Sequence, residues 1–137
     1  MSAGTRVGVG ERVAAAAQAT VGVPFRLHGR DPATGLDCVG VVAVALRAGG
    51  HMGPVPDGYR LRCGGVAAYR PCWGGLIAVD GMAAGDVLLC RVGPGQLHLA
   101  VRTEAGIVHA DAGLRRVVER PGALPWPLVT AWRLGDG

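Results

Sequence analysis

The sequence predicts an α+β domain in which N-terminal helices pack on an antiparallel sheet. The clearest helix-forming segments occur before residue 50, and short apolar or alternating runs separated by turn residues begin near Ala84. Helices followed by strands, rather than alternating with them, are typical of this class. A chain of 137 residues is long enough for one domain, 1–137, with a substantial core.

The N-terminal part predicts one helix and two irregular segments. The helix covers Glu11–Thr20, which is rich in Ala and is followed by Gly22 and Pro24. Residues 25–36 are polar, contain Gly and predict a loop. Residues 49–75 contain Gly, Pro and scattered Arg without a clear period. They predict an irregular segment with at most one short helix.

A second helix is expected where a cysteine opens an apolar run. Asp37 precedes the run Cys38–Leu46, Arg47 follows it and Gly49 lies just beyond, which are start and stop signals of a helix. A thiol in the first turn faces unpaired backbone N–H groups and the positive end of the helix dipole, and both favour the reactive thiolate. The sequence therefore predicts a nucleophile and an enzyme. The β-branched valines of the run leave a buried strand as the competing interpretation.

The C-terminal half predicts a sheet of about five strands. Each is a short apolar or alternating run, and Gly, Pro and Ala turns separate them. Close spacing and tight turns predict an antiparallel meander. The expected strands are Val87–Val92, Gln96–Thr103, Ile107–Asp111, Leu114–Arg120 and Val129–Leu134.

Composition excludes several classes of catalysis. All 14 cationic residues are Arg, so Schiff-base and P-loop chemistry, which need Lys, are excluded. The only Ser is Ser2, near a terminus, which argues against a serine hydrolase. The chain has no Asn, so a Cys-His-Asn arrangement cannot form.

Charge and hydropathy set the expected partners and location. The net charge is +4, and the arginines are scattered with few aromatic residues between them, so we expect no nucleic-acid partner. No segment has the length of a membrane span or the pattern of a secretory leader. We therefore expect synthesis in the cytoplasm without a signal peptide.

The other cysteines predict inert thiols. The four cysteines form no Cys-x-x-Cys pair, so disulfides are not expected. Cys90 lies within an expected strand and is predicted to be buried. A zinc site from Cys63, Cys72 and a His is the alternative. The main prediction includes no metal and no cofactor.

Two of the four histidines can serve Cys38. His28 and His51 lie in expected loops and are predicted to be surface residues, whereas His98 and His109 lie in consecutive strands. If Glu104 and Ala105 form a two-residue turn, both strand imidazoles share one face of the sheet, where diagonal neighbours are close.

A reaction follows from this arrangement. Cys38 would attack an amide carbonyl, His98 would take and return the proton, and His109 would hold His98 in its working tautomer. The same strand register sets Asp111 across from His98, so Asp111 is the alternative to His109 as the residue that orients His98. Backbone N–H groups at the start of the helix would stabilise the oxyanion.

Four short segments follow one another in a fixed order between about Glu11 and Leu134. They are Val23-Pro24-Phe25-Arg26 with Gly35-Leu36-Asp37-Cys38-Val39-Gly40, then Ala84-Gly85-Asp86-Val87, Leu97-His98-Leu99-Ala100-Val101 and Ile107-Val108-His109-Ala110. Together they resemble the signature of the NlpC family of cell-wall cysteine peptidases, in which Pro-Tyr-Arg and Gly-Asp-Cys-Ser-Gly precede Pro-Gly-Asp, His-Val-Gly-Ile and Ile-His-Ala strands.

The resemblance implies a papain-like α+β fold with a triad of Cys38, His98 and His109. It implies cleavage of the peptidoglycan stem peptide without a metal, and places Phe25, Asp37 and Asp111 as substrate-binding residues. Small stand-alone members of this kind occur in phage tails and gene-transfer particles, so a tail-associated lysin with hub-protein partners is expected.

Two departures affect this expectation. The family's Tyr, whose hydroxyl often lies near the nucleophile, is Phe25 here, and Val39 stands where Ser follows the cysteine. Two other functions therefore remain: a structural tail-hub or binding module of the same fold, and a related amidase or acyltransferase.

Overall fold

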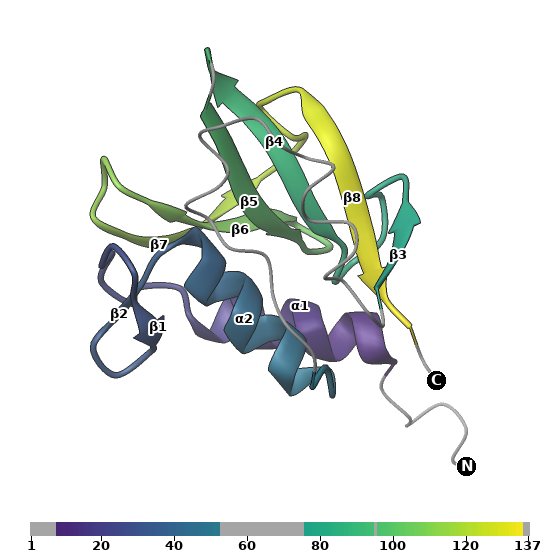
Figure 1. Ribbon diagram of the computed structural model, residues 1–137, viewed down its shortest axis with the longest axis horizontal. Coiled ribbons are helices and arrows are strands. Elements are labelled where there is room, and N and C mark those ends of the chain that lie inside the picture. Colours follow the sequence, from purple (N-terminus) through teal and green to yellow (C-terminus); the bar gives the residue numbers. More distant parts are fainter. Residues whose placement is uncertain (1–7, 53–75, 95, 136–137) are drawn as a thin grey trace.

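The structure, a computed structural model, describes residues 8–52, 76–94 and 96–135. Two helices, α1 (Val9–Ala19) and α2 (Cys38–Ala48), pack against each other and on one side of a six-stranded antiparallel sheet (Figure 1). The predicted α+β class is confirmed. The sheet strands are β3 (Leu76–Val79), β4 (Val87–Gly93), β5 (Gln96–Arg102), β6 (Gly106–Asp111), β7 (Arg116–Pro121) and β8 (Leu128–Leu134).

The sheet extends the predicted meander by one strand. Its order is β3-β8-β4-β5-β6-β7, so β4 to β7 form the meander, and β8 returns to pair with β4. The additional strand is β3, which pairs with β8 at the outer edge. Each of the five expected strands is present within two residues of its predicted ends.

A small hairpin replaces part of the expected loop before α2. Its strands are β1 (Arg30–Asp31) and β2 (Gly35–Leu36). Leu36 is fully buried, and Phe25 forms an isolated bridge to it. Tertiary packing of Leu36 therefore orders a segment whose polar composition alone predicts a loop.

The helix interpretation of the run after Asp37 is confirmed. The Asp37 carboxylate caps α2 by accepting a hydrogen bond from the Gly40 N–H at 2.8 Å, and Gly49 ends the helix. A Cβ atom at Gly40 would collide with the carbonyl oxygen of Gly29. This close approach ties the first turn of α2 to the loop before β1, which fixes where the helix begins.

The core lies on both faces of the sheet. The larger cluster joins the helices to one face and includes Val42, Leu46 and Leu99. The opposite face carries a smaller cluster that includes Cys90 and Ile107, against which Trp126 packs. The cross-strand pairing of Cys90 with His98 places the first strand histidine on this second face.

Candidate active site

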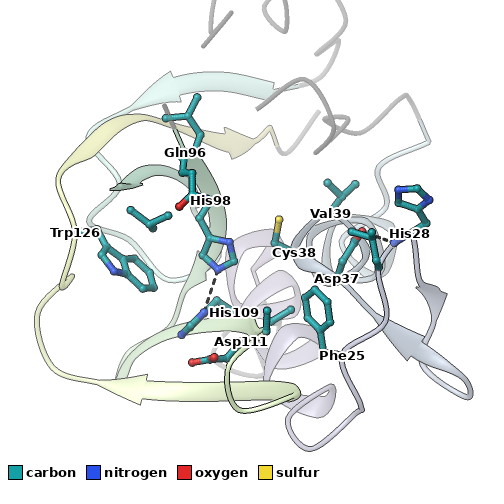
Figure 2. Close-up of a pocket in the computed structure, with 15 residues that line it drawn as sticks. Phe25, His28, Asp37, Cys38, Val39, Gln96, His98, His109, Asp111 and Trp126 are labelled. Atoms are coloured by element: carbon teal, nitrogen blue, oxygen red, sulfur yellow. Dashed lines mark hydrogen bonds between the residues drawn. The ribbon is translucent and has the colours of Figure 1, made fainter. Parts of the chain in front are cut away.

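A pocket of about 560 Å³ lies beside the N-terminus of α2. Figure 2 shows its lining residues, which come from the loop before β1, from α2, from β5 and β6, and from the loop before β8. All six site residues expected from the sequence line this pocket. They are Phe25, Asp37, Cys38, His98, His109 and Asp111.

Cys38 is the first residue of α2, and its sulfur faces the imidazole of His98 (Figure 2). The backbone N–H groups of Leu99 and Val39 act on the sulfur and lower the pKa of the Cys38 thiol. Burial acts in the opposite direction and outweighs them, and the Asp37 charge adds to it, so that the Cys38 pKa is raised to about 11. Burial of the sulfur thus opposes the helix-end effect from which the sequence predicts a thiolate.

The Leu99 N–H reaches the sulfur because strands β5 and β6 separate. Their ladder comprises Val101 with Val108 and Arg102 with Ile107, which is the register expected from the two-residue turn. Beyond these pairs β6 continues to pair with β7. The N–H groups of β5 that point toward β6 beyond these pairs are therefore available to the first turn of α2. Helix α2 contacts both strands.

His98 and His109 form a direct hydrogen bond. The Nε2 atom of His98 lies 3.1 Å from Nδ1 of His109, and the two rings are perpendicular with their centroids 5.2 Å apart. If His98 donates this hydrogen bond, its Nδ1 carries a lone pair, which is the form that can accept the thiol proton. The predicted sharing of one face by the two imidazoles is confirmed.

Both imidazoles are neutral over the physiological pH range. Burial, followed by the neighbouring His109, lowers the pKa of His98 to about 4, while the Asp111 charge opposes the shift. Burial also lowers the pKa of His109, again against Asp111. Burial therefore favours the neutral form of the Cys38 thiol and of both imidazoles.

Asp111 acts on the histidines through its charge. Its Oδ1 accepts a hydrogen bond from the Leu114 N–H at 2.9 Å, in the turn after β6. Its partner in the ladder is Arg116 of β7, and the ladder that would set it opposite His98 ends earlier. Of the two expected third members, His109 is the one that contacts His98 directly.

Asp37 holds the wall of the pocket together. One carboxylate oxygen accepts from Gly40 N–H and from Arg30 at 2.7 Å, and the other accepts from the His28 N–H at 2.8 Å. The residue is only 5 % exposed. Its oxygens thus cap the helix and bind the preceding loop. Asp37 therefore has a structural role in addition to the substrate-binding role expected from the sequence.

We expect the Asp37→Ala variant to lose about 2 kcal/mol of unfolding free energy, because a helix cap is removed and the Arg30 partner is lost. Asp37→Asn keeps an acceptor for the Gly40 N–H and should lose about half as much. Urea unfolding of the two variants and the wild type measures this difference. Equal stability of all three proteins would contradict the role assigned to the carboxylate.

Trp126 is the main pocket residue that the sequence reasoning missed. Its ring is perpendicular to both imidazoles, with centroids 5.5 Å from His98 and 5.0 Å from His109. The available signal was its position between Pro125 and Pro127, in a segment read only as a turn. Leu27, Val92 and Gln96 also line the pocket and were not singled out.

The loop histidines differ from each other. His28 is exposed as expected, and lines the pocket. The surface prediction for His51 is wrong, because this residue is 4 % exposed. Its N–H binds the Leu46 carbonyl and its own carbonyl accepts from the Arg47 side chain, so the chain folds back on the end of α2.

Of the other three cysteines, only Cys90 lies in the part of the chain that the structure describes. Cys90 is buried and free, as expected. Cys63 and Cys72, with the alternative zinc site, lie outside the described residues, as does most of the segment 49–75. Within the described ranges no three candidate ligands gather around a metal position. No helix in the same ranges is long and apolar enough to cross a membrane.

Solved structures share this fold. No protein-family model matches the sequence, and no curated protein does. NlpC1 of Trichomonas vaginalis matches 94% of the chain with a TM-score of 0.68 and 21% identity, and NlpC2 of the same organism matches 94% with a TM-score of 0.66 and 18% identity. The NlpC/p60 domain of the peptidoglycan hydrolase SagA matches 89% of the chain, with a TM-score of 0.58 and 25% identity.

These matches define the fold class. The chain covers 96% of the SagA domain, but it spans only 45% of NlpC1 and 48% of NlpC2. The protein therefore has the papain-like α+β fold of NlpC/p60 domains, as the sequence resemblance implied.

Proposed function

We propose that this protein is a cysteine peptidase that hydrolyses amide bonds in the stem peptide of peptidoglycan. The observation that carries the proposal is one pocket that holds a thiol at a helix N-terminus beside a hydrogen-bonded pair of histidines. The similarity to the NlpC/p60 domain of a peptidoglycan hydrolase supports the substrate class.

The proposed reaction begins from the neutral pair. As the Cys38 sulfur attacks the amide carbonyl carbon, the thiol proton passes to Nδ1 of His98. The negative charge on the carbonyl oxygen is stabilised by backbone N–H groups at the start of α2. His98 then gives the proton to the leaving amine as the C–N bond breaks, which leaves a thioester on Cys38.

Water completes the cycle. His98 takes a proton from a water molecule that attacks the thioester carbonyl, and returns that proton to the sulfur as the C–S bond breaks. The products are a carboxylic acid and the free thiol. Throughout, the hydrogen bond between His98 and His109 keeps the ring in place, and the resulting imidazolium is stabilised by the Asp111 charge.

We expect alkylation of Cys38 by iodoacetamide to rise with pH until about pH 11, because its raised pKa of about 11 leaves it protonated at neutral pH. Mass spectrometry of the alkylated peptide over a pH series measures the rate. A rate that is already maximal at pH 5–6 would show a preformed thiolate–imidazolium pair and contradict the neutral resting state.

Mutation of His109 and of Asp111 shows which of the two is the third residue of the proposed triad. We expect His109→Ala to lower kcat by about 100-fold, because His98 loses the hydrogen bond that orients it. Asp111→Asn removes only a charge and should lower kcat by less than about 10-fold. Steady-state kinetics on a soluble muropeptide measures both. A larger loss in the Asp111 variant would make Asp111 the orienting residue.

Incubation with defined muropeptides, followed by mass analysis of the products, tests the function itself. New amine and acid ends within the stem peptide support the peptidase. Products from lipid esters or other amides, with intact muropeptides, would support the amidase or acyltransferase. An absence of turnover on every substrate would favour a structural module.

We also propose that the protein is a tail-associated lysin of a phage or phage-like particle. The support is its sequence resemblance to family members of such particles, and the expected partners are hub proteins of the tail. Mass spectrometry of purified particles tests this proposal independently of the assay on muropeptides.

A further inference from the structure

Trp126 contacts both members of the histidine pair. Its ring stands at 88° to His98 and at 88° to His109, an edge-to-face arrangement that aromatic rings favour. The Nε2 atom of His109 is buried and has no hydrogen-bond partner among the described residues. The His109 side chain is thus closed off from water on the side where Trp126 packs (Figure 2).

Three local features hold Trp126 in this position. Pro125 and Pro127 restrict the backbone on either side of it. The Pro127 carbonyl accepts a hydrogen bond from the Arg91 N–H at 3.0 Å, which ties the segment to β4. A shift in register between β4 and β8 follows immediately, because Leu89 pairs with Thr130 while Cys90 pairs with Leu128. Such bulges re-aim nearby side chains.

We propose that Trp126 is a positioning residue that keeps water from His109 and thereby fixes the proton arrangement of the His98–His109 pair. This inference rests on the proposed function. The Nε2 atom of His109 has no hydrogen-bond partner among the described residues, and its Nδ1 hydrogen-bonds to Nε2 of His98. When His109 Nδ1 accepts from His98, the lone pair of His98 stays on Nδ1, beside the sulfur. Water at His109 Nε2 would give this ring a second hydrogen-bond partner and let it turn away from His98.

The charged and titratable groups around the pair come from four elements. Cys38 of α2 and Cys90 of β4 face His98 as neutral thiols, since burial raises the pKa of each to about 11. Asp111 of β6 raises the histidine pKa values, and Arg120 of β7 lowers that of His109. Burial is the largest effect on both rings, and Trp126 contributes to that burial.

Nitrogen-15 NMR titration of the substrate-free protein tests the proposal, with His98→Gln and His109→Gln variants assigning the signals. In the wild type we expect His98 to titrate near pH 4 and to be protonated on Nε2 above that pH. In Trp126→Ala we expect the pKa of His98 to rise by at least about 1 unit toward its ordinary value, with mixed tautomers. Trp126→Phe, which keeps a ring over both imidazoles, should retain most of the wild-type behaviour.

Steady-state kinetics on a muropeptide provides a second measurement. We expect Trp126→Ala to lower kcat by at least about 10-fold with KM changed by less than about 3-fold, and the acid limb of kcat/KM to move to higher pH. An unchanged His98 titration, or a raised KM with kcat intact, would overturn the proposal. If the Ala variant does not fold, Trp126→Leu, which keeps apolar bulk without a ring, takes its place in the same comparison. Because the NMR reading needs no substrate, it stands even if the protein cleaves no muropeptide.

Discussion

The Cys38→Ala variant is expected to lose muropeptide hydrolysis by at least about 10⁴-fold in kcat, because the thioester intermediate cannot form. No other described residue that lines the pocket carries a thiol or a hydroxyl group that could replace the sulfur. The change removes one atom from a half-buried side chain at the start of α2, so the helix and its cap should persist. Product masses from wild type and variant, at equal protein concentration, measure the loss.

Cys90→Ala is the matched control for this experiment. Cys90 is also a free thiol, but it is buried, belongs to the second core cluster and does not line the pocket. This variant should lose about 1 kcal/mol of stability, and it should lose far less of its hydrolytic rate than Cys38→Ala, because Cys90 lies beside His98 without lining the pocket. Equal product from wild type and Cys38→Ala would remove the peptidase mechanism, whatever the control shows.

The His98→Ala variant is expected to lose about 10³-fold to 10⁴-fold in kcat at neutral pH, because the thiol then has no general base. Its pH dependence is the more specific result. With the Cys38 pKa near 11, the remaining activity should increase about tenfold per pH unit up to that value, as the thiolate forms without help.

Two measurements complete the test of His98. Added imidazole should restore part of the activity at neutral pH, since a small base can enter the space that the side chain leaves. The wild type should instead be nearly independent of pH above about 5, because His98 is deprotonated above its pKa of about 4. A variant with the same flat profile as the wild type would mean that His98 does not activate the sulfur.

The sequence predicted those parts of the site that depend on helix start and stop signals or on a tight turn. Asp37 and Gly49 defined α2, and a two-residue turn between β5 and β6 set the register that brings His98 and His109 together. These features depend on neighbours within a few residues, or on one tight turn, so pattern and turn chemistry suffice.

Features that depend on contacts between distant segments could not be predicted in this way. The raised pKa of Cys38 results from its burial, and the site of Trp126 results from the pairing of β8 with β4. The hairpin of β1 and β2 forms because Leu36 of β2 is buried in the core. Periodicity carries no information about such contacts, since they join residues far apart in the chain.

The order of the elements along the chain has a consequence for biosynthesis. Cys38 leaves the ribosome with α2, whereas His98 and His109 follow with β5 and β6. The strand that completes the sheet beside β4, β8, comes last among these elements. A nascent chain therefore carries the proposed nucleophile before its base, and the proposed enzyme can gain its activity only after β5, β6 and β8 have been synthesised.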